Sequence, residues 1–269
     1  MKVAAIQMNS VKCIEQNLLD AYAFVKEAAN LGARLIVLPE MFLCFGIKKY
    51  SDVSTRYCSE KALQQSIGAW AKEFNAFIVA GSVPYNNDPK NEKVYASSFI
   101  FSDEGSILGR YDKIHLFDAN IDDEFAHYRE SDAFLAGESP KVVSVGDTLL
   151  GMSICYDLRF PELFQHYQAK SCRIISIPSA FTYETGKQHW EILLRARAIE
   201  TQSYVIAANQ VGVHEDGRRT WGHSMIVSPS GEILAQIEGS KPGIAIAELD
   251  FKLQDEIMRS MPLQKHKRL

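Results

Sequence analysis

Short apolar runs rich in β-branched residues recur along the whole chain, and they constrain its fold more than any other feature. Examples are VAAIQM at 3–8, RLIVLP at 34–39, TLLGMSIC at 148–155 and YVIAANQV at 204–211. Several of these runs are apolar nearly throughout, which is typical of strands covered on both faces. Segments with helical spacing lie between some of them, at 17–33, 61–76 and 189–202. This alternation predicts an α/β fold with a mixed sheet or two packed sheets.

Two other segments predict β-hairpins. In 94–117 the turn DEGS separates two apolar runs, and in 224–238 the turn PSG does the same. Residues 118–139 form the longest stretch without clear periodicity, and such loops inside compact domains are often functional. No repeat or linker interrupts the chain, so residues 1–269 are expected to form a single domain.

Charge and cysteine content exclude several classes of function. The net charge is −4 and the pI is near 6.0, so there is no electrostatic argument for nucleic acid or membrane, and small molecules are the expected partners. No run reaches membrane-spanning length, and the start of the chain does not match a signal peptide. The five cysteines are scattered without a CxxC pair, which argues against disulfides or structural zinc and favours a reducing, cytoplasmic location.

The sequence GMSICYDLRFPE at 151–162 places Cys155 where an apolar strand gives way to a helix that starts near Pro161. A thiol beside free N–H groups at the positive end of a helix is favoured as thiolate, and the same amides can hold an oxyanion. A free cysteine considered alone is more often a small, inert core residue. This segment leaves both interpretations open.

Two charged residues stand in comparable positions. Glu40 directly follows RLIVLP, and burial there would raise its pKa and suit it to act as a general base. Lys113 lies in GRYDKIHLFD between apolar neighbours, where it could stabilise an oxyanion and donate a proton to a leaving amine. Each residue taken alone is more often a surface charge. Together with Cys155 they supply the base, the cation and the nucleophile of acyl transfer.

The histidines allow two alternatives. A papain-like Cys–His pair is compatible with the composition, but no spacing identifies the histidine, and Glu40 and Lys113 would have no role. His214 and His223 in HEDGRRTWGH could suggest a metal site. The gap between them and the flanking arginines favour a Gly-rich hairpin loop instead, so a metal site is not expected here.

The motifs LPEMF, GRYDKIHLFD and CYDLRFPEL, in this order, resemble the nitrilase (carbon–nitrogen hydrolase) superfamily over essentially the whole chain. The resemblance implies an α-β-β-α sandwich that hydrolyses a non-peptide C–N bond through a cysteine thioester, without a metal or an organic cofactor. It assigns Glu40 as the general base, Lys113 as the oxyanion-binding residue and Cys155 as the nucleophile. The backbone N–H of Tyr156 completes the oxyanion hole, and Glu130 of HYRES is a supporting glutamate. Homodimers or larger homo-oligomers are also implied.

Finer detail resembles the branch of deaminated glutathione amidases, through CYDLRFPEL, PSAFTYETGKQHWEILLRARAIETQSYVIAANQ and RRTWGHSMIVSP. The sister ω-amidases, which act on α-ketoglutaramate, share several elements but tend to lack the proline of RFPEL and the serine of PSAF. The expected reaction is hydrolysis of a small carboxylate-bearing amide with release of ammonia, as a deaminated glutathione amidase or alternatively as an ω-amidase. Hydrolysis of an N-carbamoyl amine or a nitrile, and a non-catalytic interaction protein, are further alternatives.

The same resemblance predicts a pocket wall at Ala180, Phe181 and Thr182. A carboxylate-bearing substrate needs a cation or N–H donors. Arg159, within the nucleophile turn, is a candidate for this cation, although bracing of that turn through Asp157 is the favoured role. Trp190 is expected to pack in the core rather than to contact substrate.

Overall fold

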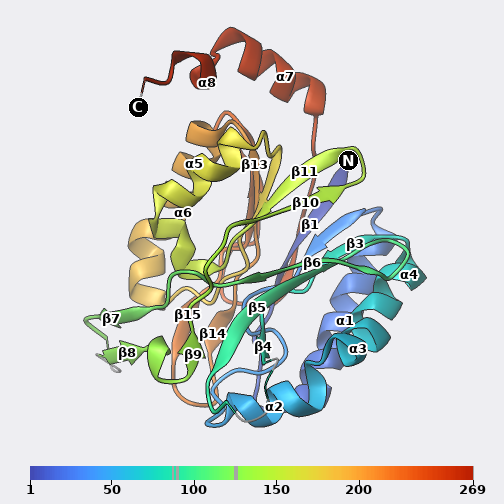
Figure 1. Cartoon of the computed structure of the whole chain (residues 1–269), viewed down its shortest axis with the longest axis vertical. Helices are drawn as coiled ribbons and strands as arrows, with labels where there is room; N and C mark the ends of the chain where they lie inside the picture. Colours follow the sequence, from blue (N-terminus) through green and yellow to red (C-terminus); the bar gives the residue numbers. More distant parts are fainter. Residues whose placement is uncertain (87, 89–90, 124–126, 269) are drawn as a thin grey trace.

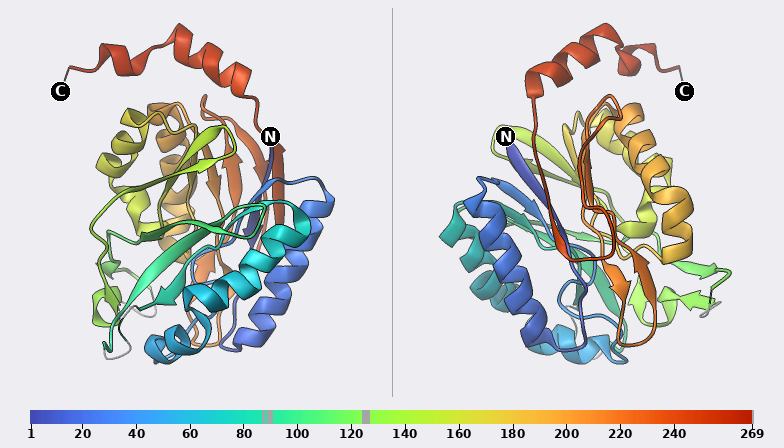
Figure 2. Two further views of the ribbon diagram at one scale, coloured as in Figure 1. Left: turned by 45° about the vertical axis from the view of Figure 1, so that its right-hand side comes forward. Right: turned by 180° about the vertical axis from the view of Figure 1, so that it is seen from behind.

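Two β-sheets pack face to face between two layers of helices (Figure 1 and Figure 2). The computed structural model describes the whole chain except residues 87, 89–90, 124–126 and 269. Apolar side chains from the facing sides of both sheets form one core cluster that includes Val3, Val37, Leu150, Met152 and Val205. The predicted α-β-β-α sandwich in a single domain is therefore confirmed.

The first sheet has parallel strands in its centre and antiparallel strands around them. Its strands are β1 (Lys2–Gln7), β2 (Leu35–Val37), β3 (Phe77–Val79), β4 (Val83–Tyr85), β5 (Val94–Phe101), β6 (Ile107–Asp112), β9 (Phe134–Leu135) and β18 (Gly243–Glu248). Strands β1, β2 and β3 are parallel, and β18 and β5 flank them in antiparallel orientation. The order is β18-β1-β2-β3-β5-β4, and β6 and β9 also pair with β5.

The second sheet also has parallel strands in its centre and antiparallel strands on both sides. Its strands, in spatial order, are β10 (Lys141–Val145), β11 (Thr148–Met152), β12 (Ile174–Ser176), β13 (Tyr204–Ala207), β16 (Met225–Val227) and β17 (Ile233–Gln236). Strands β11, β12 and β13 are parallel. Two short hairpins stand apart from the sheets: β7 (Asp118–Asn120) with β8 (His127–Arg129), and β14 (Val211–Val213) with β15 (Arg219–Trp221).

Both predicted hairpins are confirmed, as the antiparallel pairs β5–β6 and β16–β17. Their turns contain Gly105 at φ +87° and Gly231 at φ +84°. This left-handed conformation carries no steric cost for glycine, which explains why these turn sequences were informative.

Helices cover the outer face of each sheet. The first sheet carries α1 (Ile14–Asn30), α2 (Tyr50–Tyr57), α3 (Glu60–Leu63) and α4 (Ala69–Phe74), and the second carries α5 (Pro161–Ala169) and α6 (Tyr183–Thr201). Helix α1 buries one stripe, which contains Ile14, Ala21, Val25 and Ala28. It ends before Gly32, whose φ of +91° reverses the chain.

The helix boundaries differ from the sequence predictions in several places. The segment predicted at 61–76 is two short helices joined by a π-helical turn at 64–68, and the helix predicted at 189–202 begins at Tyr183. Helix α2 was not predicted, because its sequence YSDVSTRY has no apolar stripe and buries only Val53 and Ser54.

The C-terminal helices α7 (Phe251–Ser260) and α8 (Leu263–His266) were not predicted either, and they lie at the end of the sandwich opposite β7 and β8 (Figure 1). Arg173 holds α7 in place through hydrogen bonds to the carbonyl oxygen of Phe251 and the carboxylate of Asp255. None of the helices in the described part of the chain is both long and apolar enough to cross a bilayer.

Candidate active site

Glu40 closely follows β2, and only 6% of its side chain is exposed. One carboxylate oxygen accepts a hydrogen bond from Lys113 Nζ at 2.8 Å, and the other accepts one from the backbone N–H of Ala180 at 2.8 Å. The next residue, Met41, has φ +53°, and its N–H donates to Ser82 Oγ at 3.0 Å. This sharp turn after an apolar strand directs the carboxylate into the protein rather than into solvent.

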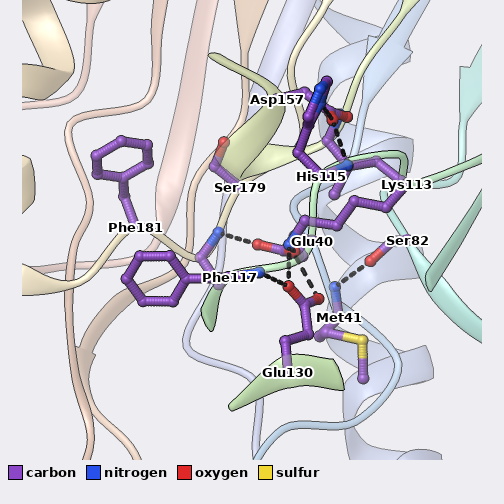
Figure 3. A network of polar contacts seen from close by, with 12 residues as sticks. Glu40, Met41, Ser82, Lys113, His115, Phe117, Glu130, Asp157, Ser179 and Phe181 are labelled. Carbon is purple, nitrogen blue, oxygen red and sulfur yellow. Dashed lines mark hydrogen bonds and ion pairs between the residues drawn. The ribbon is translucent and has the colours of Figure 1, made fainter. Parts of the chain in front are cut away.

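Lys113 directly follows β6, and its side chain is 2% exposed, so the alternative of a surface cation is wrong. Figure 3 shows its ammonium group between the carboxylates of Glu40 and Glu130. Both oxygens of Glu130 lie 2.9 Å from Nζ, and Glu130 also accepts a hydrogen bond from the backbone N–H of Phe117 at 2.6 Å. Three residues that are far apart in sequence therefore form one buried ionic network.

The charges of this network are set by burial and by proximity. Burial alone lowers the pKa of Lys113, but the carboxylates of Glu130 and Glu40 raise it more strongly, and the pKa lies well above its ordinary value. Burial also raises the pKa of Glu130, although the charge of Lys113 opposes that change. Lys113 is consequently a permanent cation that two carboxylates share.

Cys155 begins a 3₁₀ turn (Cys155–Arg159) between β11 and α5, and Pro161 occupies the first position of α5 as predicted. The φ angle of Cys155 is +47°, a conformation that costs a non-glycine residue roughly 1–3 kcal/mol. The backbone N–H of Cys155 donates to Pro178 O at 2.9 Å. Tyr156 is the second residue of this turn, where a backbone N–H has no intrahelical acceptor.

The thiol of Cys155 differs from its expected state. Burial raises its pKa well above the ordinary value, the carboxylate of Glu40 adds to this increase, and Lys113 only partly opposes it. The pKa of Cys155 shifts in the direction opposite to that expected for a thiol at a helix entrance, because the thiol precedes α5 by a separate turn and lies beside a carboxylate. A neutral thiol needs a base before it can attack, and Glu40 is placed to be that base.

Asp157 braces the nucleophile turn by accepting four hydrogen bonds. Oδ2 accepts from the N–H of Ile154 at 2.8 Å and from Tyr111 OH at 2.7 Å. Oδ1 lies 3.1 Å from the N–H of His115 and 2.7 Å from its Nδ1 (Figure 3). Tyr111 and His115 stand on either side of Lys113, so this one carboxylate joins the lysine segment to the cysteine turn.

The predicted bracing of this turn by Arg159 through Asp157 is wrong. Arg159 Nη1 instead lies 3.3 Å from His189 Nδ1, and its guanidinium group covers the rings of Tyr156 and Phe181. Tyr111 and His115 provide the brace because the end of the first sheet passes directly beside the turn.

We predict that Asp157→Asn lowers the free energy of unfolding by about 2–4 kcal/mol. The NH₂ group of asparagine would face hydrogen-bond donors that the carboxylate of Asp157 now accepts from, so at least one buried hydrogen bond would be lost. We also expect kcat to fall roughly 10–100-fold with little change in KM, since Cys155 and Lys113 lose their relative placement. Denaturant unfolding and steady-state kinetics measure both effects. Asp147→Asn in the exposed β10–β11 turn is the matched control. An unchanged kcat in a destabilised Asp157→Asn protein would limit Asp157 to a structural role.

A cavity of about 400 Å³ reaches from the surface to Cys155. Its deep end is bordered by Glu40, Lys113, Glu130 and Cys155. Aromatic side chains line the walls between this end and the opening, namely Phe45, Tyr50, Phe117, Tyr128 and Phe134. A volume of this size, with apolar walls and a few converging polar groups, is typical of a small-molecule site.

A family model described as carbon–nitrogen hydrolase matches residues 2–258. The chain belongs to the carbon–nitrogen hydrolase family. The family membership predicted from the three motifs is thereby confirmed, together with the enzyme class. The buried acid, amine and thiol lie at the base of the cavity of this hydrolase.

Relatives of this carbon–nitrogen hydrolase include named amidases. A deaminated glutathione amidase of Yersinia enterocolitica is 40% identical, over 99% of this chain and 92% of the relative. The human ω-amidase NIT2 is 33% identical, over 99% of this chain and 95% of the relative. The crystal structure of the C. elegans NitFhit protein superimposes with a TM-score of 0.91 at 34% identity; the match covers 99% of this chain and 65% of that longer protein.

The residues predicted to line the pocket of this hydrolase are only partly at the cavity. Ala180 and Thr182 border it. Phe181 does not, because its side chain is 3% exposed and packs against Trp190 with ring centroids 5.1 Å apart. Trp190 is fully buried and donates to His223 O at 2.8 Å, which confirms that it packs in the core. Arg159 lies outside the cavity wall, although its charge is near enough to interact with Cys155.

The opening of the cavity carries residues that sequence reasoning did not select, among them Arg129, Asp216, Arg218 and Arg219. The only available signal was the arginine pair within HEDGRRTWGH, which was interpreted as part of a hairpin loop. That hairpin exists as β14–β15. Its neighbours in space, β8 and the start of α6, could not be inferred from local sequence.

No metal site is found in the described part of the chain: it contains no group of three or more His, Cys, Asp or Glu side chains that could hold an ion. His214, considered above as a ligand, uses both ring nitrogens, since Nδ1 lies 3.1 Å from Ser10 O and Nε2 lies 2.8 Å from Thr220 Oγ1. Burial lowers its pKa to about 4, so it is a neutral packing residue.

Proposed function

We propose that this amidase hydrolyses a small carboxylate-bearing α-keto amide through a thioester at Cys155, with deaminated glutathione as the first candidate substrate. The observation that carries the proposal is the buried Glu40–Lys113–Glu130 network beside the thiol at the deep end of one cavity. The Yersinia relative named as a deaminated glutathione amidase supports this choice of substrate.

The mechanism follows from the positions of these groups. Glu40 accepts the thiol proton as Cys155 Sγ bonds to the carbonyl carbon, and the oxygen becomes an oxyanion held by Lys113 Nζ and the N–H of Tyr156. The C–N bond then breaks, and the proton on Glu40 goes to the leaving nitrogen. Glu40 next deprotonates a water molecule that attacks the thioester, and the departing thiolate takes that proton back.

Lys113 acts as a fixed cation in this scheme. Its contacts with the carboxylates of Glu40 and Glu130 favour the charged form, so Glu40, which already holds the thiol proton, replaces Lys113 as the proton donor to the leaving group. Glu130 positions the ammonium group through its two 2.9 Å contacts.

The identity of the leaving group depends on the substrate. A primary amide such as α-ketoglutaramate releases ammonia, as expected from the sequence. For deaminated glutathione the expected release of ammonia is wrong, because its amide nitrogen belongs to the cysteine residue, and hydrolysis there releases cysteinylglycine, an amine. Both reactions use the same groups on the protein.

The alternative functions differ in how much support they have. An ω-amidase is the nearest alternative, because the human relative bears that name. The two positions expected to separate the branches, Pro161 and Ser179, do not border the cavity, so neither can contact the substrate directly. A non-catalytic protein on the same scaffold predicts a blocked pocket, whereas this cavity is open to Cys155.

A substrate panel tests the proposed function. We expect kcat/KM for deaminated glutathione, followed by release of cysteinylglycine, to exceed that for α-ketoglutaramate, followed by release of ammonia, at least tenfold. N-carbamoyl amines and aliphatic nitriles test the remaining alternatives, and turnover of either class faster than both amides would favour that activity. Faster turnover of α-ketoglutaramate would assign the chain as an ω-amidase, and no turnover of any amide would favour the non-catalytic alternative.

Two further expectations belong to this proposal. All five cysteines are free, which supports a reducing, cytoplasmic setting. The homodimer implied by the family resemblance stays a prediction, and sedimentation velocity of the purified chain would test it.

A further inference from the structure

The cationic side chains that border the catalytic cavity differ in whether a carboxylate pairs with them. The four with a permanent positive charge are Lys113, Arg129, Arg218 and Arg219. Lys113 is paired with two glutamates, and Arg218 Nε lies 2.7 Å from Asp216 Oδ2. Among the residues that the structure describes, no carboxylate lies within ion-pair distance of Arg129 or Arg219. Both arginines are exposed, so these two cations stand at the opening of the cavity.

Arg219 is held in an orientation suited to binding an anion. Its guanidinium group lies over the ring of Tyr183, the first residue of α6, at 4.0 Å from the ring centroid. Stacking fixes the plane of the guanidinium group while its in-plane N–H groups stay available for hydrogen bonds. The guanidinium group of Arg219 donates to no group within the described residues. Arg219 also borders a second pocket, which Tyr183 and Trp221 line.

Arg129 is placed by its own hairpin. Its guanidinium donates to Tyr128 O at 2.7 Å, to Asn120 Oδ1 at 2.9 Å and to Ala119 O at 3.3 Å. Asp118 is its partner across the β7–β8 pair; its carboxylate accepts a hydrogen bond from the N–H of Ser131 at 3.0 Å, and this bond, with a smaller contribution from the charge of Arg129, lowers the Asp118 pKa. The residue after Arg129 is Glu130, which contacts Lys113, so the same short segment reaches both ends of the cavity.

We propose that Arg219, assisted by Arg129 at the border of the same cavity, binds a carboxylate at the leaving-group end of an extended amide substrate. This inference rests on the proposed function and adds a specificity-determining site to it. Deaminated glutathione carries one carboxylate on its keto-acid half and another on its glycine, whereas α-ketoglutaramate has only the first. A cation at the opening therefore favours the extended substrate without affecting the chemistry at Cys155.

The test compares deaminated glutathione with its C-terminal glycinamide, which lacks only the distal carboxylate. For the unmodified protein, kcat/KM for the acid should exceed that for the amide about tenfold, and added salt should reduce this preference. Arg219→Gln should lower kcat/KM for the acid roughly five- to tenfold through KM, and leave the glycinamide and α-ketoglutaramate within about twofold. Arg129→Gln should act in the same direction.

Matched variants separate this role from a general effect of charge. Arg219→Lys keeps a point charge without the fork of N–H groups and should recover part of the preference. Arg56→Gln changes an exposed arginine on α2 that does not border the cavity, and it should leave the preference intact. Equal loss for all three substrates in Arg219→Gln, or equal turnover of acid and glycinamide by the unmodified protein, would overturn the inference. No turnover of deaminated glutathione by the unmodified protein would overturn the proposed function itself.

Discussion

Cys155→Ala should reduce amide turnover roughly 10⁴-fold or more for every accepted substrate, because no thioester can form without the sulfur. The fold should persist, since the change removes only the sulfur atom from a small side chain. The positive φ at position 155 costs alanine about as much as it costs cysteine. Circular dichroism and thermal unfolding monitor the fold, and product release monitors the activity. In the unmodified protein, hydroxylamine should trap the acyl group as a hydroxamate, and this product should be absent from the variant.

Cys172→Ala is the matched control for Cys155→Ala. Cys172 is also buried, its pKa is raised to about 12 by burial, and it does not border the cavity. Its replacement should leave turnover within about twofold. If Cys155→Ala retained more than about 1% of the activity, the covalent mechanism would have to be abandoned.

Lys113→Met should reduce both the stability and the activity of the protein, for separate reasons. Removing the cation leaves Glu40 and Glu130 facing each other in a buried site, which should lower the free energy of unfolding by about 3–5 kcal/mol at pH 8. Turnover should fall roughly 10³-fold, because the oxyanion loses its charged donor. Like-charged buried carboxylates have raised pKa values, so the folded variant retains a proton that the unfolded chain releases. Stability of the variant should therefore recover as the pH falls from 8 toward 5 and decrease again as it rises.

A second substitution separates the two losses. Lys113→Met combined with Glu130→Gln removes one of the opposed carboxylates, so it should regain part of the stability without regaining activity. Denaturant unfolding at pH 5.5 and 8, together with turnover at both pH values, provides the comparison. A single Lys113→Met protein whose stability is independent of pH, or whose activity is within tenfold of normal, would contradict the assigned role of the ammonium group.

Local patterns were sufficient to predict much of this fold. The apolar runs became strands covered on both faces, and the turns at Gly105 and Gly231 formed because glycine accepts a positive φ there. Pro161 marked the start of α5 because a first-turn proline loses no hydrogen bond. Helix α2 and the π turn at 64–68 were missed, since packing against the first sheet rather than an apolar stripe stabilises them.

The candidate site was predicted less completely. Glu40, Lys113 and Cys155 could be selected because each accompanies an apolar run, and recognition of the family motifs added Glu130. The upward shift of the Cys155 pKa could not be predicted, because it depends on burial and on Glu40, neither of which the local sequence reveals. Arg159 was expected to brace the turn through Asp157. The partners of Asp157 are instead Tyr111, on β6 of the first sheet, and His115, which follows β6.

The sequence by itself determined many of the elements and the chemical types: a series of buried strands, two hairpins, and an acid, an amine and a sulfur beside them. Only the tertiary structure decided how those groups meet, since Glu40 contacts Lys113 across 73 residues and Ala180 across 140. Such contacts depend on how the two sheets pack and align, and short-range periodicity contains no information about that alignment. If experiment placed the side chains of Glu40, Lys113 and Cys155 apart, the proposed hydrolysis would have no physical basis.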